Sequence, residues 1–231
     1  MKNLSLLVMR GLLFLISTLL VVACKPEIHT EIYAGDILEV MQTGDPLSVP
    51  LRINLPIMIA SNCEDDKKKM IPPLEQYGKN VRFVQCKTVS GEMYDHLEVE
   101  MEATIVQKSK YVDDKSFGMF GIVVSEESVG RITIEFVTTK SVANAVSAID
   151  KSYVMQTVEL DDMSLTTVFN NDTRNPVIFE IDGSFVDGKA IDVPTEFTLE
   201  RRSRIEVIPS NVRSISIIRN GIGRFGRIIV N

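Results

Sequence analysis

The stretch Leu97–Val106 alternates strictly between apolar and polar residues. The apolar positions are Leu97, Val99, Met101, Ala103 and Ile105, and the polar positions between them are Glu98, Glu100, Glu102 and Thr104. A period of two places the two sets on opposite faces of an extended chain. The pattern predicts an antiparallel strand with one face buried and the other in contact with water.

Two helices are predicted. The first begins at Cys63, where Asn62 can cap it, acidic residues come before lysines as the helix dipole favours, and Gly78 ends it. Its two prolines, Pro72 and Pro73, are expected to kink or split it. The second helix covers residues 141–153 with Ser141 as its cap. Its buried stripe is expected to consist of Val142, Ala145, Val146 and Ile149.

The rest of the chain is predicted to be mostly β-structure. The expected strands cover 31–40, 51–59, 81–89, 97–106, 131–138, 156–170 and 176–186, followed by short segments at 191–199, 204–208, 214–219 and 227–230. The order strand–helix–strand–strand occurs twice, which favours a pseudo-repeat. We therefore predict an α+β fold, mainly antiparallel sheet with two short helices. Residues 31–107 would form a first half, 108–130 a connecting loop and 131–231 a second, β-rich half.

Residues 1–24 have the layout of a secretory signal peptide. Lys2 and Arg10 precede an apolar run that is short for a membrane span, and small Ala23 is followed by Cys24. The end of this segment, Val21-Val22-Ala23-Cys24, resembles the lipobox of bacterial lipoproteins. The resemblance implies a signal peptide at 1–23, a diacylglycerol and palmitate-type acylation at Cys24, and a lipidated tether at 24–30. An ordinary signal peptide is the alternative.

The lipoprotein resemblance also implies a location. It predicts a domain held at the membrane by its N-terminal lipid, in the periplasm of a bacterial cell envelope. Lys25 follows the lipidated cysteine, and in enterobacteria-like cells a residue other than Asp at this position favours the outer membrane.

The chain has 31 acidic against 25 basic residues. This acidic balance, with no basic stripe, argues against a nucleic-acid partner.

Cys63 and Cys86 are the cysteines that remain after Cys24. An even number of cysteines in an oxidising compartment predicts a disulfide bond between them. The alternative is a metal site. It is disfavoured because the only two histidines of the chain, His29 and His96, lie elsewhere in the sequence.

The chain ends with a dinucleotide-like motif, G-x-G-x-x-G, at Gly221, Gly223 and Gly226. In a nucleotide-binding fold a helix begins at the third glycine, so that its N-terminus faces the pyrophosphate. Only five residues, with a β-branched run, follow Gly226. We therefore predict a turn at Asn220-Gly221 and a closing strand after it, with no nucleotide and no cofactor.

The segment 117–123, FGMFGIV, has two interpretations. Its large side chains could cover the core. Alternatively Phe117, Met119 and Phe120 could form a docking loop for an envelope protein or lipid, with glycines that let it reshape.

No catalytic motif is recognisable, so we expect a non-enzymatic binding or envelope-assembly module. It could act as a prophage- or plasmid-type exclusion lipoprotein. The alternative is a hydrolase of cell-wall or lipid material that uses carboxylates such as Glu100 or Asp161. His96 is expected in a solvated turn and His29 in the tether. No metal site is expected, because the acidic pairs are adjacent in loops.

Overall fold

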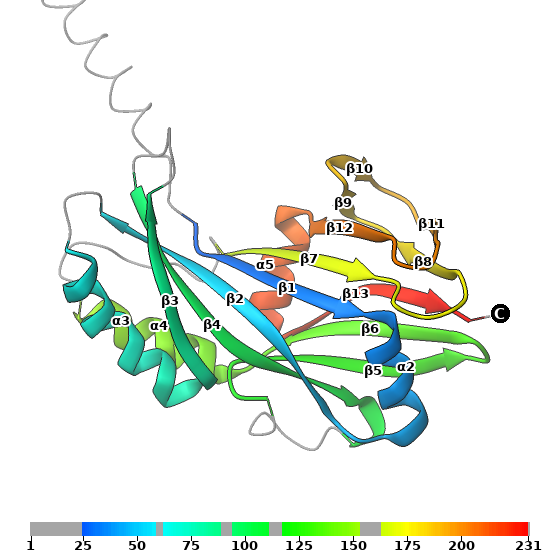
Figure 1. Cartoon of the computed structure of the whole chain (residues 1–231), viewed down its shortest axis with the longest axis horizontal. Coiled ribbons are helices and arrows are strands. Elements are labelled where there is room, and N and C mark those ends of the chain that lie inside the picture. The colour runs from blue at the N-terminus through cyan, green and yellow to red at the C-terminus, as the bar shows by residue number, and fades with distance from the viewer. Residues whose placement is uncertain (1–24, 59–61, 89–93, 111–116, 153–162, 231) are drawn as a thin grey trace, which may run out of the picture.

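The computed structural model describes residues 25–58, 62–88, 94–110, 117–152 and 163–230 (Figure 1). In chain order the elements are β1 (Glu27–Tyr33), α2 (Ala34–Thr43), β2 (Leu47–Met58), α3 (Cys63–Tyr77), β3 (Lys79–Thr88), β4 (Tyr94–Gln107), η1 (Lys108–Lys110), β5 (Phe120–Ser128), β6 (Arg131–Thr138), α4 (Lys140–Ser152), β7 (Ser164–Asn170), β8 (Val177–Ile181), β9 (Ser184–Val186), β10 (Lys189–Ile191), β11 (Thr195–Leu199), β12 (Arg204–Pro209), α5 (Asn211–Asn220) and β13 (Ile222–Ile229).

All the described strands belong to one sheet of 13 strands. Along its main path the order is β10-β9-β12-β7-β1-β2-β4-β5-β6-β13-β8-β11, and β3 pairs with β4 beside this path. One edge of β4 pairs with β2 over the whole length of β2, from Tyr94 to Ile105 of β4. The other edge is shared, because β3 pairs with Asp95–Glu102 and β5 with Thr104–Gln107. The sheet therefore forks at β4.

The alternation of β4 is confirmed. Its apolar residues are all buried, with Leu97 at 0% and Met101 at 1% exposure, whereas Glu98 and Glu100 are only partly buried on the opposite face. The buried face of β4 forms part of the main hydrophobic core, together with Met70 and Leu74 of α3.

The sheet curls so that strands from its two halves pack face to face. Phe169 lies on β7 and Phe179 on β8, and these strands are separated in the sheet order by β1, β2, β4, β5, β6 and β13. The two rings nevertheless stack with their centroids 4.2 Å apart. Both rings are fully buried, so the interior of the curl is the core.

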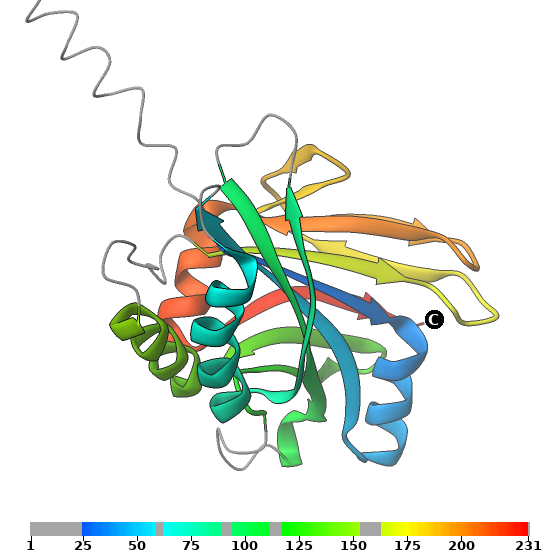
Figure 2. The ribbon, with the colours of Figure 1, turned by 60° about the vertical axis from the view of Figure 1, so that its left-hand side comes forward.

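Helices α3 and α4 pack against each other beside β3 and β4 (Figure 2). The predicted cap of α3 is confirmed, because the Asn62 side chain accepts a hydrogen bond from the Glu64 N–H at 3.1 Å. The helix is continuous through Pro72 and Pro73, so the two prolines do not split it. Gly78 ends it by donating its N–H to the Leu74 carbonyl.

The buried stripe of α4 is confirmed, but its cap is not the residue predicted. All four residues of the stripe are at most 8% exposed. The helix begins at Lys140, and the Thr139 hydroxyl accepts the hydrogen bond of the Ser141 N–H at 3.1 Å. Thr139 therefore has the capping role that the sequence suggested for Ser141.

The predicted fold class, a mainly antiparallel α+β fold with two short helices, is wrong. Sheet dominates the described residues, and four α-helices accompany it. The sheet is also mixed, because β1 pairs with β7, and β4 with β5, in parallel. The segments 31–40 and 214–219, expected as strands, contribute most of α2 and α5.

The two additional helices form because packing outweighs local preference. In α5 the β-branched residues favour a strand, but Ile217 and Ile218 are buried on one side of a helix. In α2 the residues Ile37 and Val40 are buried at helical spacing, and Gly44 ends the helix with a left-handed φ of 70°.

The proposed pseudo-repeat is also wrong at the level of pairing. In the first unit, β4 pairs with both β2 and β3. In the second unit, β7 pairs with β1 and β12, whereas β8 pairs with β11 and β13. The same order of elements therefore builds two different arrangements.

Segments predicted as connections contribute strands. Residues 120–128 of the expected connecting loop form β5, between β4 and β6. The expected tether, 24–30, contains the first half of β1, which pairs with β2 and β7. Within the described residues, no helix has both the length and the apolar character needed to cross a membrane.

Candidate binding site

The solvent-facing side of β1, β2, β4 and β3 carries polar residues in register across the sheet. Figure 1 shows these four strands side by side, toward the viewer. One row contains Glu27, Asn54, Glu98 and Gln85, the next contains His29, Arg52, Glu100 and Arg82, and on the other side of the first row His96 lies opposite Lys87. Carboxylates and cations are thus brought within reach of each other by strand pairing.

A cavity of about 440 Å³ lies over these rows. It is lined by Glu27, His29, Arg52, Asn54, Lys87, His96 and Glu98. His96 is only 9% exposed and the Glu98 side chain 13%, so these two form the floor. Arg52, at 58%, and Lys87 are exposed and form the rim. We call this set of seven residues the polar cavity.

The carboxylate of Glu27 is committed to contacts within the polar cavity. One of its oxygens lies 3.2 Å from Nε2 of His29 and accepts a hydrogen bond from the Asn54 amide at 3.3 Å. The His29 contact is the main cause that lowers the pKa of Glu27, and the Asn54 hydrogen bond adds to it against the effect of burial. Glu27 is therefore held as an anion.

The carboxylates of β4 are likewise committed. Glu98 accepts a hydrogen bond from Gln85 at 2.8 Å and lies 3.5 Å from Arg52. Glu100, just outside the cavity, accepts a hydrogen bond from Arg82 at 2.8 Å, and its other oxygen lies 3.5 Å from Arg52. The Arg82 hydrogen bond is the main cause that lowers the pKa of Glu100.

Lys87 differs from the other charged residues of the polar cavity. Its side chain is exposed, and no carboxylate of the residues that the structure describes lies within ion-pair distance of its ammonium. Arg52 is exposed as well, and its two ion pairs are long. The cavity therefore retains hydrogen-bond donors and positive charge on its rim, whereas its carboxylates already have partners.

A second polar concavity lies over β5, β6 and β13, and its cations are paired with carboxylates. Its arginine Arg227 pairs with Glu127 and Glu180, each at 2.6 Å. Lys108 pairs with Glu135 at 2.9 Å, and Arg224 with Asp182 at 2.6 Å. These ion pairs give each of the three cations, Arg227, Lys108 and Arg224, a carboxylate partner from the protein itself. The polar cavity, where Lys87 has no such partner within the described part of the chain, is therefore the better candidate for a ligand.

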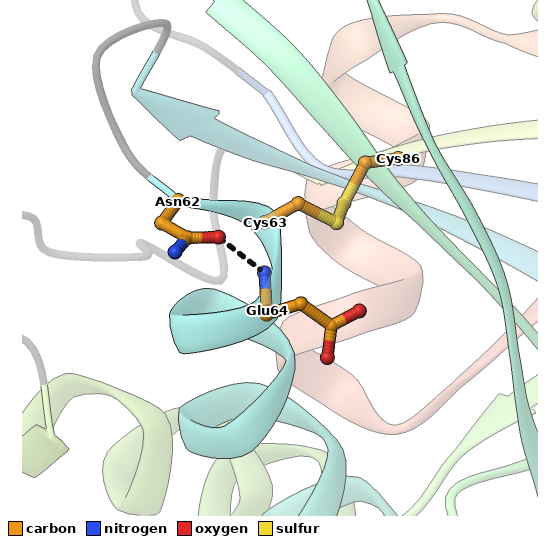
Figure 3. The surroundings of a disulfide bond; sticks show 4 residues. All are labelled: Asn62, Cys63, Glu64 and Cys86. Atoms are coloured by element: carbon orange, nitrogen blue, oxygen red, sulfur yellow. Dashed lines mark hydrogen bonds between the residues drawn. A yellow bond between two sulfur atoms is a disulfide. The ribbon is translucent and has the colours of Figure 1, made fainter.

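The predicted disulfide between Cys63 and Cys86 is confirmed (Figure 3). It joins the first residue of α3 to β3, with 6.2 Å between the two Cα atoms. Beside it, Asn62 caps the helix at the same point. The helix and the edge strand are therefore linked at the end of the sheet that carries Lys87.

The three residues of the docking-loop interpretation lie in the protein interior. Phe117 and Phe120 are 0% exposed and Met119 is 2% exposed. Phe117 packs with Val106, Val123 and Val137, while Phe120 belongs to the main core. These positions favour the alternative interpretation, in which the segment covers the core.

Other residues singled out in the sequence lie as follows. His29 is in β1 and His96 in β4, and both line the polar cavity instead of a tether or a solvated turn. Glu100 is adjacent to the cavity, while Cys24 and Asp161 lie outside the described residues. Among the described residues there is no group of three or more His, Cys, Asp or Glu that could hold a metal ion.

The alternation of β4 was the signal that could have located part of this site. It places His96, Glu98 and Glu100 on one face, but it does not indicate which strands lie on either side. Sequence reasoning missed Glu27, Arg52, Asn54 and Lys87, because the pairing of β1, β2 and β3 brings them there.

The glycine motif lies in and just before β13, and a helix precedes it instead of following it. Gly221 ends α5 with a φ of 78°. Within the strand, a Cβ on Gly223 would lie 2.4 Å from Ile217, and one on Gly226 would lie 2.6 Å from Phe179. The glycines therefore have packing reasons that do not involve a nucleotide.

One family model matches the chain, the domain of unknown function DUF7424, over residues 26–230. The chain belongs to this family. Comparison with curated proteins and with solved structures gave no match. The DUF7424 match covers nearly all of the described residues, including every residue of the polar cavity.

Proposed function

We propose that this DUF7424 chain is a bacterial lipoprotein whose domain, anchored through Cys24, is a non-enzymatic binding module of the cell envelope. In this proposal the polar cavity is its binding site. The observation that carries it is the order of features in residues 1–24: basic residues, an apolar run, small Ala23 and then Cys24. Lys25 supports transfer to the outer membrane, with the domain facing the periplasm.

Only a short connection separates Cys24 from the sheet. Strand β1 begins at Glu27, three residues after Cys24. A lipid on Cys24 would therefore attach directly beside the sheet, without a long flexible linker. Two or three acyl chains hold a protein stably at a bilayer, whereas one holds it only marginally.

The state of two carboxylates argues against either of them as the general acid of the hydrolase alternative. A general acid needs a raised pKa, so that it still carries its proton near neutral pH. The pKa of Glu27 is lowered by the His29 contact, and that of Glu100 by the Arg82 hydrogen bond. Both groups are thus ionised near neutral pH, which does not suit a general acid.

Labelling with radioactive palmitate tests the anchor. Wild type and Cys24→Ala are expressed side by side in a bacterial host, and membranes are separated from soluble fractions. We expect label and membrane retention in the wild type and loss of both in Cys24→Ala. Equal labelling of the two proteins, or no label in either, would contradict the proposal.

A further inference from the structure

The polar cavity lies close to the residue that would carry the lipid. Consecutive Cα atoms are 3.80 Å apart, so three residues allow at most about 11 Å between the Cα atoms of Cys24 and Glu27. Glu27 lines the cavity. If Cys24 sits at the bilayer surface, the Cα atom of Glu27 in the cavity lining lies within about 11 Å of the Cα atom of that anchored residue.

The other strands bring their cavity residues to the same end of the sheet. Lys87 is the residue before the last in β3, and His96 is the third residue of β4. The register pairs the two with each other, next to the row that contains Glu27 and Glu98. Figure 1 shows the end of β3 and the beginnings of β4 and β1 at the upper left, on one side of the molecule.

The chemistry that remains available in the cavity suits an anion. Glu27 and Glu98 already accept hydrogen bonds from neighbouring side chains. The exposed donors on the rim are the ammonium of Lys87, which has no carboxylate partner among the described residues, and the guanidinium of Arg52, whose ion pairs with Glu98 and Glu100 are both 3.5 Å long. A guanidinium binds phosphate oxygens through two parallel hydrogen bonds, and an ammonium acts as a compact point charge.

We propose that the polar cavity binds the phosphate-bearing headgroup of an anionic lipid in the membrane that holds Cys24. This inference rests on the proposed function, because only lipidation places the cavity at a membrane. Lys87 and Arg52 contact the phosphate, and His29 lines the cavity beside Arg52. Binding of a headgroup fixes how the domain is oriented on the bilayer.

The chain contains its own reporters for a test. It has two histidines, and both line the polar cavity. Histidine-selective isotope labelling of the full-length lipoprotein in neutral detergent therefore gives ring signals from the cavity alone. The protein is titrated with short-chain phosphatidylglycerol, with short-chain phosphatidylcholine and with glycerol 1-phosphate.

We expect saturable shifts of both histidine signals with phosphatidylglycerol and much weaker ones with phosphatidylcholine. Lys87→Gln should weaken phosphatidylglycerol binding roughly fivefold, since one basic residue near an anionic surface contributes on that scale. The matched control Lys189→Gln removes an exposed lysine of β10, at the far edge of the sheet, and should leave binding unchanged.

Four outcomes would overturn the inference. The histidine signals do not move, phosphatidylcholine binds as well as phosphatidylglycerol, or Lys189→Gln weakens binding as much as Lys87→Gln. Tighter binding of glycerol 1-phosphate than of the lipid would point to a free phosphate compound and would also overturn it. Absence of palmitate label from the wild type would contradict the proposed lipid anchor at Cys24. That result comes from a separate experiment, so the two failures can be told apart.

Discussion

The carboxylate of Asp172 accepts a hydrogen bond from the backbone N–H of Gly35 at 2.8 Å, across 137 positions of the chain. Gly35 is the second residue of α2, and the residue before that helix, Tyr33, provides no side-chain cap. A distant loop therefore supplies the acceptor that a helix start needs. A Cβ on Gly35 would lie 2.7 Å from the same carboxylate, so the close approach depends on glycine.

Loss of this contact should destabilise the protein. We expect Asp172→Ala to lower the free energy of unfolding by about 1 kcal/mol, the usual value of a helix cap. For a domain of this size the melting temperature should fall by about 2–4 °C. Asp172→Asn keeps a side-chain oxygen acceptor and is the control, which should lose less. Equal losses would show that the hydrogen bond is not the cause.

Removal of the Cys63–Cys86 disulfide should have a larger effect. The bond closes a loop with a sequence separation of 23. In the chain-entropy description such a loop is worth about 3 kcal/mol. Denaturant unfolding of the wild type and of a Cys63→Ser, Cys86→Ser double variant measures this difference. Free thiols at these two positions in exported, unreduced protein would contradict the pairing.

The segment with Phe117 and Phe120 should behave as core. Replacing both by serine removes two fully buried rings, and each truncation of this kind costs about 3–5 kcal/mol. We expect the double variant to lose its cooperative melting transition. Phe185→Ser is the control, because that side chain is 43% exposed and should change stability little. If the double variant keeps the melting temperature of the wild type, the result would support the docking-loop interpretation instead.

Gly226→Ala tests why the glycine motif exists. The new Cβ would lie 2.6 Å from Phe179 and 3.1 Å from the Glu180 carbonyl oxygen, so either the ring or the strand must shift. Overpacking of this kind costs about 1–3 kcal/mol. Thermal melting of the variant measures the cost. Added NAD should not shift the melting temperature of the wild type, and a clear stabilisation by NAD would contradict the packing explanation.

Acidification should destabilise the protein through Glu27 of the polar cavity and through Glu100 beside it. The contact with His29 holds the pKa of Glu27 below the ordinary value of 4.5, and the Arg82 hydrogen bond does the same for Glu100. A lowered pKa in the folded state adds stability above about pH 4.5, and this is lost as the pH falls through the folded pKa. Unfolding free energies measured across this range should fall less steeply in Glu27→Gln and Glu100→Gln. If the unfolding free energy of both variants depends on pH as steeply as that of the wild type, Glu27 and Glu100 are not the cause of the acid destabilisation.

Local patterns could predict those parts of the fold that local physics decides. The alternation around Val99 and the Asn62 cap both depend on near neighbours in the chain, and both are confirmed. The disulfide could be predicted from the number of cysteines. In contrast, α5 has a β-branched sequence, and its helix is stabilised by burial of Ile217 and Ile218 against strands.

The polar cavity was harder to predict because its members come from four strands. Glu27 and Lys87 are far apart in sequence, and only the pairing β1-β2-β4-β3 brings them to one face. His96 illustrates the difference: the sequence analysis expects it in a solvated turn, whereas the register places it on the floor of a cavity. No local pattern carries strand order across such distances.

The parallel pairing of β1 with β7 has a consequence for the order of folding. The first strand of the domain lies between β2 and β7, and its pairing with Ser164–Asn170 cannot form until that segment is available. Contacts between residues so distant along the chain close slowly, because the intervening loop must be ordered first. A fragment that ends before β7 would leave one edge of β1 unpaired and prone to self-association. The chain is thus built to complete its fold late, after most of it has been synthesised.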